Sequence, residues 1–234
     1  ARGYVDESLF NSLAGDFRAG GALNDGPTQW RMLAAYQHFN QEGDAPGEPK
    51  PTNDRRIKSL QGEWKYMVDT KTQAGLGIQY GQVRFPTNEV EDFDQVFLMG
   101  SWLHSFEAKG VPLLYLAAFG SDDNAKNKMA DGVTDKSKNL AGLRSYVQYS
   151  LNPKLNLFNS LGFVYRKDKD AYARSTEVGI GRDRFGEFSL GVNWQFRKSC
   201  AVRAQWVYTR NNSNIDIYDF NRNEVTTAVR CEMD

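Results

Sequence analysis

The chain has 234 residues, which is enough for one all-β domain, and Lys and Arg balance Asp and Glu at 29 each. This neutral balance excludes a strongly basic nucleic-acid-binding protein, so no nucleic-acid partner is expected. Mean hydropathy is −0.61, and no run approaches the about 20 apolar residues of a membrane-spanning helix. A membrane β-barrel has such values too, because only alternate residues of its strands meet lipid.

Apolar residues alternate with small or polar ones along most of the chain. In 185–197, for example, Leu190 and Trp194 share one parity, and Gly191 and Asn193 share the other. Successive side chains of a strand point to opposite faces, so the pattern predicts an antiparallel transmembrane β-barrel with lipid outside and water inside. The expected strands of this single domain, 1–234, are 9–23, 28–41, 57–70, 74–86, 93–107, 111–121, 139–151, 153–167, 185–197, 199–211 and 223–233.

The links between these strands alternate in length. Long links are expected at 42–56, 122–138, 168–184 and 212–222, short ones at 24–27, 71–73, 108–110, 152–153 and near 198, and an intermediate one at 87–92. Outer-membrane barrels have long external loops and short periplasmic turns. The alternation therefore predicts that the C-terminus ends a downward strand in the periplasm.

The strand count has a further consequence, because the first expected strand also runs downward. Bacterial barrels usually have an even number of strands with both termini in the periplasm. We therefore expect the chain to be the C-terminal part of a barrel of about 12 to 14 strands, lacking upstream strands or an upstream periplasmic domain. The alternative is that the weakly alternating segment 171–182 forms a twelfth strand of its own.

Cys200 and Cys231 are the two cysteines, and their spacing does not match a metal site. Both fall on the lipid-facing parity of neighbouring predicted strands, so antiparallel pairing brings them close together. We favour two small apolar side chains over a disulfide, although an oxidising, periplasm-facing compartment would permit the bond.

The candidate residues for chemistry are few. His38 and His104 are the two histidines, and the serines of 101–105 lack the glycines of a nucleophile elbow, so we expect no catalytic residue and no enzyme. The glycines of 75–81 lack the Lys-Ser/Thr pair that grips phosphate. The acidic stretch 121–135 matches no calcium loop. We therefore expect neither a metal nor a cofactor.

The inward parity of the predicted strands contains charges of both signs. They could form a charged lining that selects or conducts a solute, or inter-strand ion pairs that fill a narrow barrel. We favour the ion pairs because neither sign dominates. The predicted lumen-lining side chains are Arg18, Arg31, Glu63, Arg144, Arg166, Arg203, Arg230 and Glu232.

Tryptophan and tyrosine mostly take the outward parity. Indole and phenol rings prefer the headgroup level of a membrane, so these residues predict aromatic girdles rather than a ligand site. The set comprises Trp30, Trp64, Trp102, Trp194, Trp206, Tyr36, Tyr66, Tyr80, Tyr149, Tyr165 and Tyr208.

The run from Tyr208 to Val225 resembles the last external loop and closing strand of the surface lipoprotein assembly modifier family, and of related barrels that follow tetratricopeptide repeats. The segment 149–158 is similar to the preceding hairpin of that family. The resemblance implies a C-terminal barrel of about 14 strands that follows a periplasmic repeat domain and helps lipoproteins reach the cell surface. The matching residues of the final loop are Ser213, Asn214, Ile215, Tyr218, Asp219 and Arg222.

We therefore expect an integral protein of a Gram-negative outer membrane. It would contact outer-membrane lipids and lipopolysaccharide, depend on the barrel assembly machinery, and meet a protein or lipoprotein cargo or a periplasmic partner. The favoured function is assistance with translocation or surface display of proteins and lipoproteins. The alternatives are a passive or exopolysaccharide-export porin and a structural anchor for other envelope components.

Overall fold

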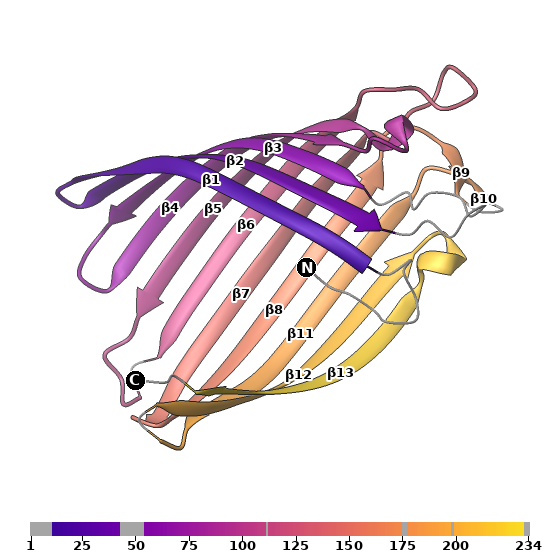
Figure 1. Ribbon diagram of the computed structural model, residues 1–234. Helices are drawn as coiled ribbons and strands as arrows, with labels where there is room; N and C mark the ends of the chain where they lie inside the picture. Colours follow the sequence, from indigo (N-terminus) through magenta and orange to yellow (C-terminus); the bar gives the residue numbers. More distant parts are fainter. Residues whose placement is uncertain (1–10, 43–53, 111, 175–176, 198, 232–234) are drawn as a thin grey trace.

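One antiparallel sheet of eleven strands forms nearly all of the molecule (Figure 1). The computed structural model describes residues 11–42, 54–110, 112–174, 177–197 and 199–231. The strands follow one another in the order of the chain, and each is antiparallel to its neighbours. The prediction of an all-β, antiparallel barrel fold is confirmed. Within the described residues, no helix is long and apolar enough to cross a membrane.

The main sheet consists of long strands, and the ends of these strands extend beyond their apolar, alternating parts. Its members are β1 (Asn11–Asp25), β2 (Thr28–Glu42), β3 (Arg55–Met67), β4 (Thr72–Arg84), β5 (Phe93–Ser105), β6 (Leu113–Ala125), β7 (Lys138–Asn152), β8 (Leu155–Asp168), β11 (Arg182–Gln195), β12 (Cys200–Ser213) and β13 (Phe220–Cys231). The links contain β9 (Tyr172–Arg174), β10 (Glu177–Gly179) and the short 3-10 helices η2 (Glu89–Glu91) and η3 (Asp216–Tyr218).

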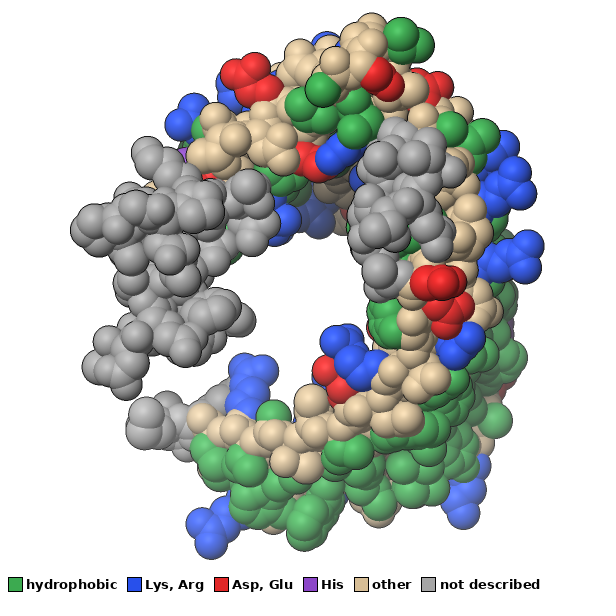
Figure 2. All heavy atoms as spheres, turned by 90° about the vertical axis from the view of Figure 1, so that its right-hand side faces the viewer, with side chains coloured by type: hydrophobic (Ala, Val, Ile, Leu, Met, Phe, Trp, Pro, Cys, Tyr) green, Lys and Arg blue, Asp and Glu red, His purple; other side chains and the backbone are tan. Residues whose placement is uncertain are grey.

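The two faces of the sheet differ as the alternation predicts. On β11, the side chains of Leu190 and Trp194 are 50% and 51% exposed, whereas Ser189 between the same neighbouring strands is 2% exposed. Pairing in register joins the apolar side chains into rows, so Trp30 lies opposite Trp64, and Trp64 lies opposite Leu76. Figure 2 shows hydrophobic side chains covering the outer surface of the lower part of the curved wall. The convex face is therefore the apolar one, and the polar parity lines the concave face.

Long and short links alternate along the sheet, as predicted. Long links gather at one end, which we call the loop end, and tight connections gather at the other, the turn end (Figure 1). Antiparallel sheets that curl in this way, with an apolar convex belt and unequal ends, are the outer-membrane type of barrel. The chain is therefore an integral outer-membrane β-barrel protein, and its loop end faces outward.

The segment 171–182 does not form a twelfth spanning strand. β9 and β10 pair with each other in a separate two-stranded sheet at the loop end. β11 begins at Arg182, three residues earlier than the sequence predicted, because its polar start pairs with both β8 and β12. Periodicity shows only the apolar part of a strand, so charged strand ends beyond the hydrocarbon were assigned to links.

Cys200 and Cys231 form a disulfide between β12 and β13, so the preference for two unbonded apolar side chains is wrong. The register places the two residues directly opposite each other, with their Cα atoms 4.2 Å apart. The bond closes a loop over a sequence separation of 31 and fastens the edge strand β13 to β12.

Aromatic rings pack against glycines on the concave face. Phe158 on β8 is 6% exposed, and a Cβ added at Gly191 of β11 would lie 2.2 Å from its ring. Likewise, a Cβ at Gly142 of β7 would lie 2.4 Å from the ring of Phe119 on β6. These two glycines therefore provide the space in which the inner aromatic side chains lie.

We expect Gly191→Ala to destabilise the barrel by about 1 to 3 kcal/mol, because the added methyl group overlaps a packed ring. Gly186→Ala on the same strand is the matched control, since the nearest atom to its Cβ lies 4.0 Å away. Urea unfolding in detergent micelles, followed by tryptophan fluorescence, measures the difference. Equal stability of the two variants would contradict this packing.

Candidate functional site

The predicted lumen-lining side chains lie on the concave face. Arg18, Arg31, Glu63, Arg144, Arg166, Arg203 and Arg230 all have the inward parity of their strands, and Glu232 lies outside the described residues. Seen from the loop end, the wall surrounds an open centre with charged side chains at its inner surface (Figure 2). Their role in selecting or conducting a solute stays a prediction.

Several of these side chains form ion pairs. Arg18 binds Asp16 on the same strand at 2.6 Å, and Gln37 on β2 donates a hydrogen bond to the same carboxylate. Glu63 lies opposite Arg31 and forms an ion pair with Lys65 at 3.2 Å. Each of these two ion pairs joins residues of one strand, β1 or β3, rather than of two neighbouring strands.

Arg203 makes a different contact, because its guanidinium group lies 4.4 Å from the centre of the Phe158 ring. This cation–π contact holds the side chain against the wall rather than in the open centre. Together with Arg230, Arg203 also lines a polar hollow of about 440 Å³ at the turn end of β11, β12 and β13. Two arginine side chains thus line this part of the lumen.

A buried acidic pair lies at the loop end of the same face. Asp168 on β8 and Asp183 on β11 are 0% and 7% exposed, and Arg166 lies 3.6 Å and 3.3 Å from their carboxylates. Ser213 donates a hydrogen bond of 2.7 Å to Asp183. The sequence prediction included Arg166 but missed both carboxylates, because they stand at strand ends that had been assigned to a link. Their inward parity was the available signal.

The final external loop, which includes the residues that resemble the family pattern, is folded against these strands. Ile215 is 3% exposed, and its backbone N–H donates to the Ser213 hydroxyl. The Asn214 side chain accepts a hydrogen bond from the backbone of Arg182 at 2.6 Å and donates to the carbonyl of Ile180. The pattern residues thus fix the link between β12 and β13 onto the start of β11.

The remaining members of that pattern end the same loop. η3 contains Tyr218, whose carbonyl accepts a hydrogen bond from Asn211 at 2.6 Å. Asp219 forms an ion pair with Arg210 at 3.2 Å, and Arg222 forms one with Glu224 at 3.2 Å. Tyr218 and Asp219 thus hold the loop against β12, whereas the Arg222–Glu224 pair lies within β13.

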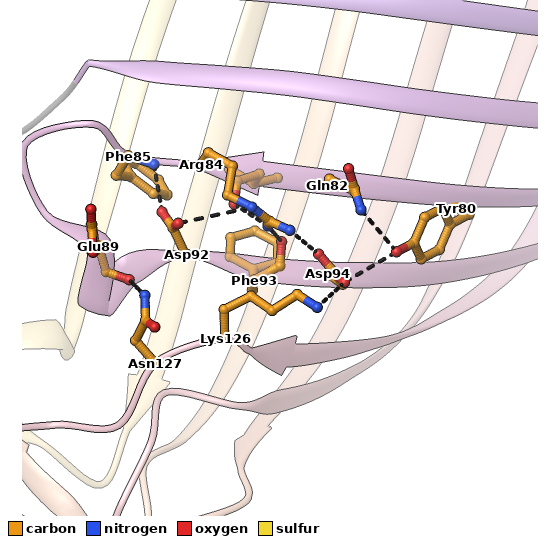
Figure 3. Close-up of polar contacts among 11 residues, drawn as sticks. Tyr80, Gln82, Arg84, Phe85, Glu89, Asp92, Phe93, Asp94, Lys126 and Asn127 are labelled. Carbon is orange, nitrogen blue, oxygen red and sulfur yellow. Dashed lines mark hydrogen bonds and ion pairs between the residues drawn. The ribbon is translucent and has the colours of Figure 1, made fainter. Parts of the chain in front are cut away.

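A network of charged side chains covers the convex face at the loop end of β4 and β5 (Figure 3). Arg84 binds Asp94 at 2.6 Å, and Lys126 binds the other oxygen of the same carboxylate at 2.7 Å. Tyr80 donates to Asp94, and the Asp92 carboxylate accepts from the backbone of Phe85. In this sector, cations and carboxylates compensate each other.

Aromatic side chains form two bands on the convex face. Near the turn end, Trp30 and Trp64 have ring centroids 6.2 Å apart, and Trp194 lies 5.8 Å from Phe196. Toward the loop end, the outward parity is taken by Tyr80, Tyr165 and Tyr208. Bands of this kind mark the two headgroup levels of a bilayer.

His104 lies on the convex face near the turn end, stacked on Trp102 at 5.3 Å. Its Nδ1 atom lies 2.8 Å from the hydroxyl of Thr72, and that hydroxyl donates to Asp69. In a hydrolytic triad the carboxylate binds the imidazole, and the imidazole binds the nucleophile. Here the hydroxyl lies between the other two groups, so this cluster does not have the order of a triad.

The acidic link between β6 and β7 is held by its own contacts. Asp131 accepts hydrogen bonds from the hydroxyl and the backbone of Thr134, and the hydroxyl is the main reason why the pKa of Asp131 is lowered. Burial raises the pKa of Asp135, but hydrogen bonds from Lys128 and Ser137 outweigh it, so that pKa is lowered as well. Among the described residues, no group of three or more His, Cys, Asp or Glu side chains is placed to hold a metal.

Neither protein-family models nor curated proteins give a match to the chain. Solved structures with a similar shape include LpxR from Salmonella typhimurium, at 9% identity over 93% of this chain and 88% of that one, with a TM-score of 0.41. The NanC porin is 12% identical, with coverages of 95% and 99% and a TM-score of 0.43. The β domain of the Bordetella autotransporter BrkA is 12% identical, with coverages of 95% and 90% and a TM-score of 0.41.

The expectation that the protein is not an enzyme is wrong. It rested on the lack of a nucleophile elbow and of a histidine triad in the sequence. LpxR, which matches most of this chain, is an outer-membrane lipid A deacylase. The lack of those motifs therefore does not exclude catalysis.

The lowered pKa values in the link 126–137 predict a loss of local stability in acid. A carboxylate with a lowered pKa in the folded state stabilises the fold above its ordinary pKa, and this contribution is lost as the pH falls through the lowered value. We expect the amide protection factors of 131–137 to drop as the pH falls below 3.8, the ordinary pKa of Asp, while those of the central strands stay high. Hydrogen exchange with mass spectrometry measures this change.

Asp131→Asn imitates the protonated carboxyl and should loosen the same link at neutral pH. Asp25→Asn, at the last residue of β1 beside the turn to β2, is the matched control. Protection of 131–137 that stays constant down to about pH 2 would contradict the stabilising role of the two carboxylates.

Proposed function

We propose that this barrel assists the translocation or surface display of proteins or lipoproteins. The observation that supports this proposal most is that, in the part of the chain that the structure describes, β1 and β13 each have one neighbouring strand and lie beside a polar interior. The resemblance of the final loop to the surface lipoprotein assembly modifier family supplies the cargo class. Under this proposal, an extended cargo segment passes the seam between the two edges.

The direction of the edge strands limits what can close this seam. The sheet has eleven strands, and all neighbours are antiparallel, so β1 and β13 run in the same direction. Within the described residues, neither edge has a second neighbouring strand. One additional strand, antiparallel to both, would satisfy the backbone groups of both edges at once. The seam is therefore shaped for strand addition.

The membrane makes an open edge costly. Hydrocarbon supplies no hydrogen-bond partner, so each unpaired backbone group costs several kcal/mol there. All described residues of β13, and those of β1 from Ala14 onward, are exposed. A strand contributed by cargo, or by an upstream part of the same protein, would remove this cost. The proposal takes cargo as the transient occupant of the seam.

Photo-crosslinking tests this proposal directly. We expect p-benzoylphenylalanine at Phe17 on β1 or at Val225 on β13 to crosslink to a surface lipoprotein produced in the same Gram-negative cell. Leu161 on β8, which has a neighbouring strand on each side, is the matched control, since it is also convex and is 51% exposed, against 69% for Phe17 and 75% for Val225. Edge-specific adducts with the lipoprotein would support the proposal. Adducts only within the chain, or equal yields at Leu161, would contradict it.

A passive pore is the second candidate, favoured by the open centre in Figure 2 and by the inward arginines. If the barrel conducts, Arg203→Gln should shift its ion selectivity toward cations, whereas Lys58→Gln on the convex face should not. Reversal potentials in planar bilayers measure the shift. If the barrel conducts and Arg203→Gln leaves its ion selectivity unchanged, Arg203 does not support the pore.

A further inference from the structure

Four cations gather on the convex face of β8, β11 and β12 at the loop end. We call Lys167, Arg182, Arg184 and Arg210 the basic cluster. Lys167 lies directly opposite Arg182 in the β8–β11 pairing, and Arg184 follows two residues later on the same face. Arg210 lies opposite Gly186, one step further along the same face. Like charges directly opposite each other destabilise a sheet unless a counter-charge is present.

The described residues provide little counter-charge for this cluster. Asp219 forms an ion pair with Arg210 at 3.2 Å. No described carboxylate forms an ion pair with Lys167, Arg182 or Arg184, and all three side chains are exposed. Four cations against one carboxylate leave three positive charges on this sector. The Arg84 network on the other side of the barrel differs, because its cations share Asp94 (Figure 3).

The cluster lies at a defined depth relative to the membrane. Arg184 is directly opposite Tyr165, and the next outward residue of β8 toward the turn end is Phe163, which is 47% exposed. Further in the same direction are Leu161 and Leu190, which are 51% and 50% exposed. Tyrosine marks the headgroup level, and the leucines mark the hydrocarbon. The cations therefore stand where the phosphates of the outer leaflet lie.

We propose that the basic cluster binds the phosphate groups of a lipid A-type glycolipid in the outer leaflet. Guanidinium groups bind phosphate with paired, charge-assisted hydrogen bonds, which suits Arg182 and Arg184. The acyl chains of the lipid would lie along Phe163, Leu161 and Leu190. A phosphorylated glycolipid is chosen over a phospholipid because the cluster is at the external end and spans three strands. This site is independent of the proposed passage of cargo.

The test uses the full chain in nanodiscs and lipid A with two phosphates as the probe. We expect Arg182→Gln with Arg184→Gln to weaken lipid A binding about tenfold or more, since two charge-assisted contacts are lost. The matched control is Arg56→Gln with Lys58→Gln, which removes the same charge from the convex face of β3, also at the loop end. Native mass spectrometry measures the bound fraction, and heat-modifiable gel mobility checks that each variant is folded.

Three outcomes decide the proposal. Selective loss in the β11 double variant, together with weaker binding of lipid A that lacks phosphates, supports it. Equal loss in both double variants would mean unspecific attraction and would overturn it. Equal binding of phosphatidylglycerol and lipid A would overturn the choice of a glycolipid.

Discussion

Hydrogen bonding between neighbouring strands is the constraint on which the rest of this structure depends. Hydrocarbon cannot satisfy a backbone N–H or C=O group, so strands that cross a membrane must pair with each other through its whole thickness. Pairing in register fixes which side chains share a face, as in the row from Trp30 to Trp64 and Leu76. The apolar belt, the polar interior and the position of every charged residue follow from this register.

The same constraint explains which features could be predicted from the sequence. A period of two is visible wherever one face meets lipid, so the strands, the alternation of links and the faces of Leu190 and Ser189 were predicted correctly. Strand ends were less visible, because beyond the hydrocarbon both faces become polar, as at Arg182 and Asp183. The disulfide was judged wrongly because parity shows that Cys200 and Cys231 share a face, but not that they are directly opposite.

The features of the candidate site differ in how far apart in the sequence the residues lie that form them. The contacts of Ser213 and Asn214 join residues about 30 positions apart, so their resemblance to a family pattern could be noticed while their structural role could not. The Asp168–Arg166–Asp183 group likewise forms only after β8 and β11 pair. Enzymatic function had been excluded from missing motifs, and the absence of a motif does not exclude catalysis. The seam and the basic cluster depend on strand direction and register, which a list of residues does not contain.

The central claim is that the even positions in the apolar part of β11, from Phe188 to Trp194, meet hydrocarbon. The access of small probes to the two faces of the wall tests this claim most directly. Nitroxide labels would be placed by Leu190→Cys and Val192→Cys on the convex face, and by Glu187→Cys and Asn193→Cys on the concave face, in lipid vesicles. Molecular oxygen, which dissolves in hydrocarbon, should speed the spin relaxation of the two labels on the convex face more strongly. A water-soluble nickel complex should speed the spin relaxation of the two labels on the concave face more strongly. Equal access of both probes at all four positions, or the opposite order, would contradict the account.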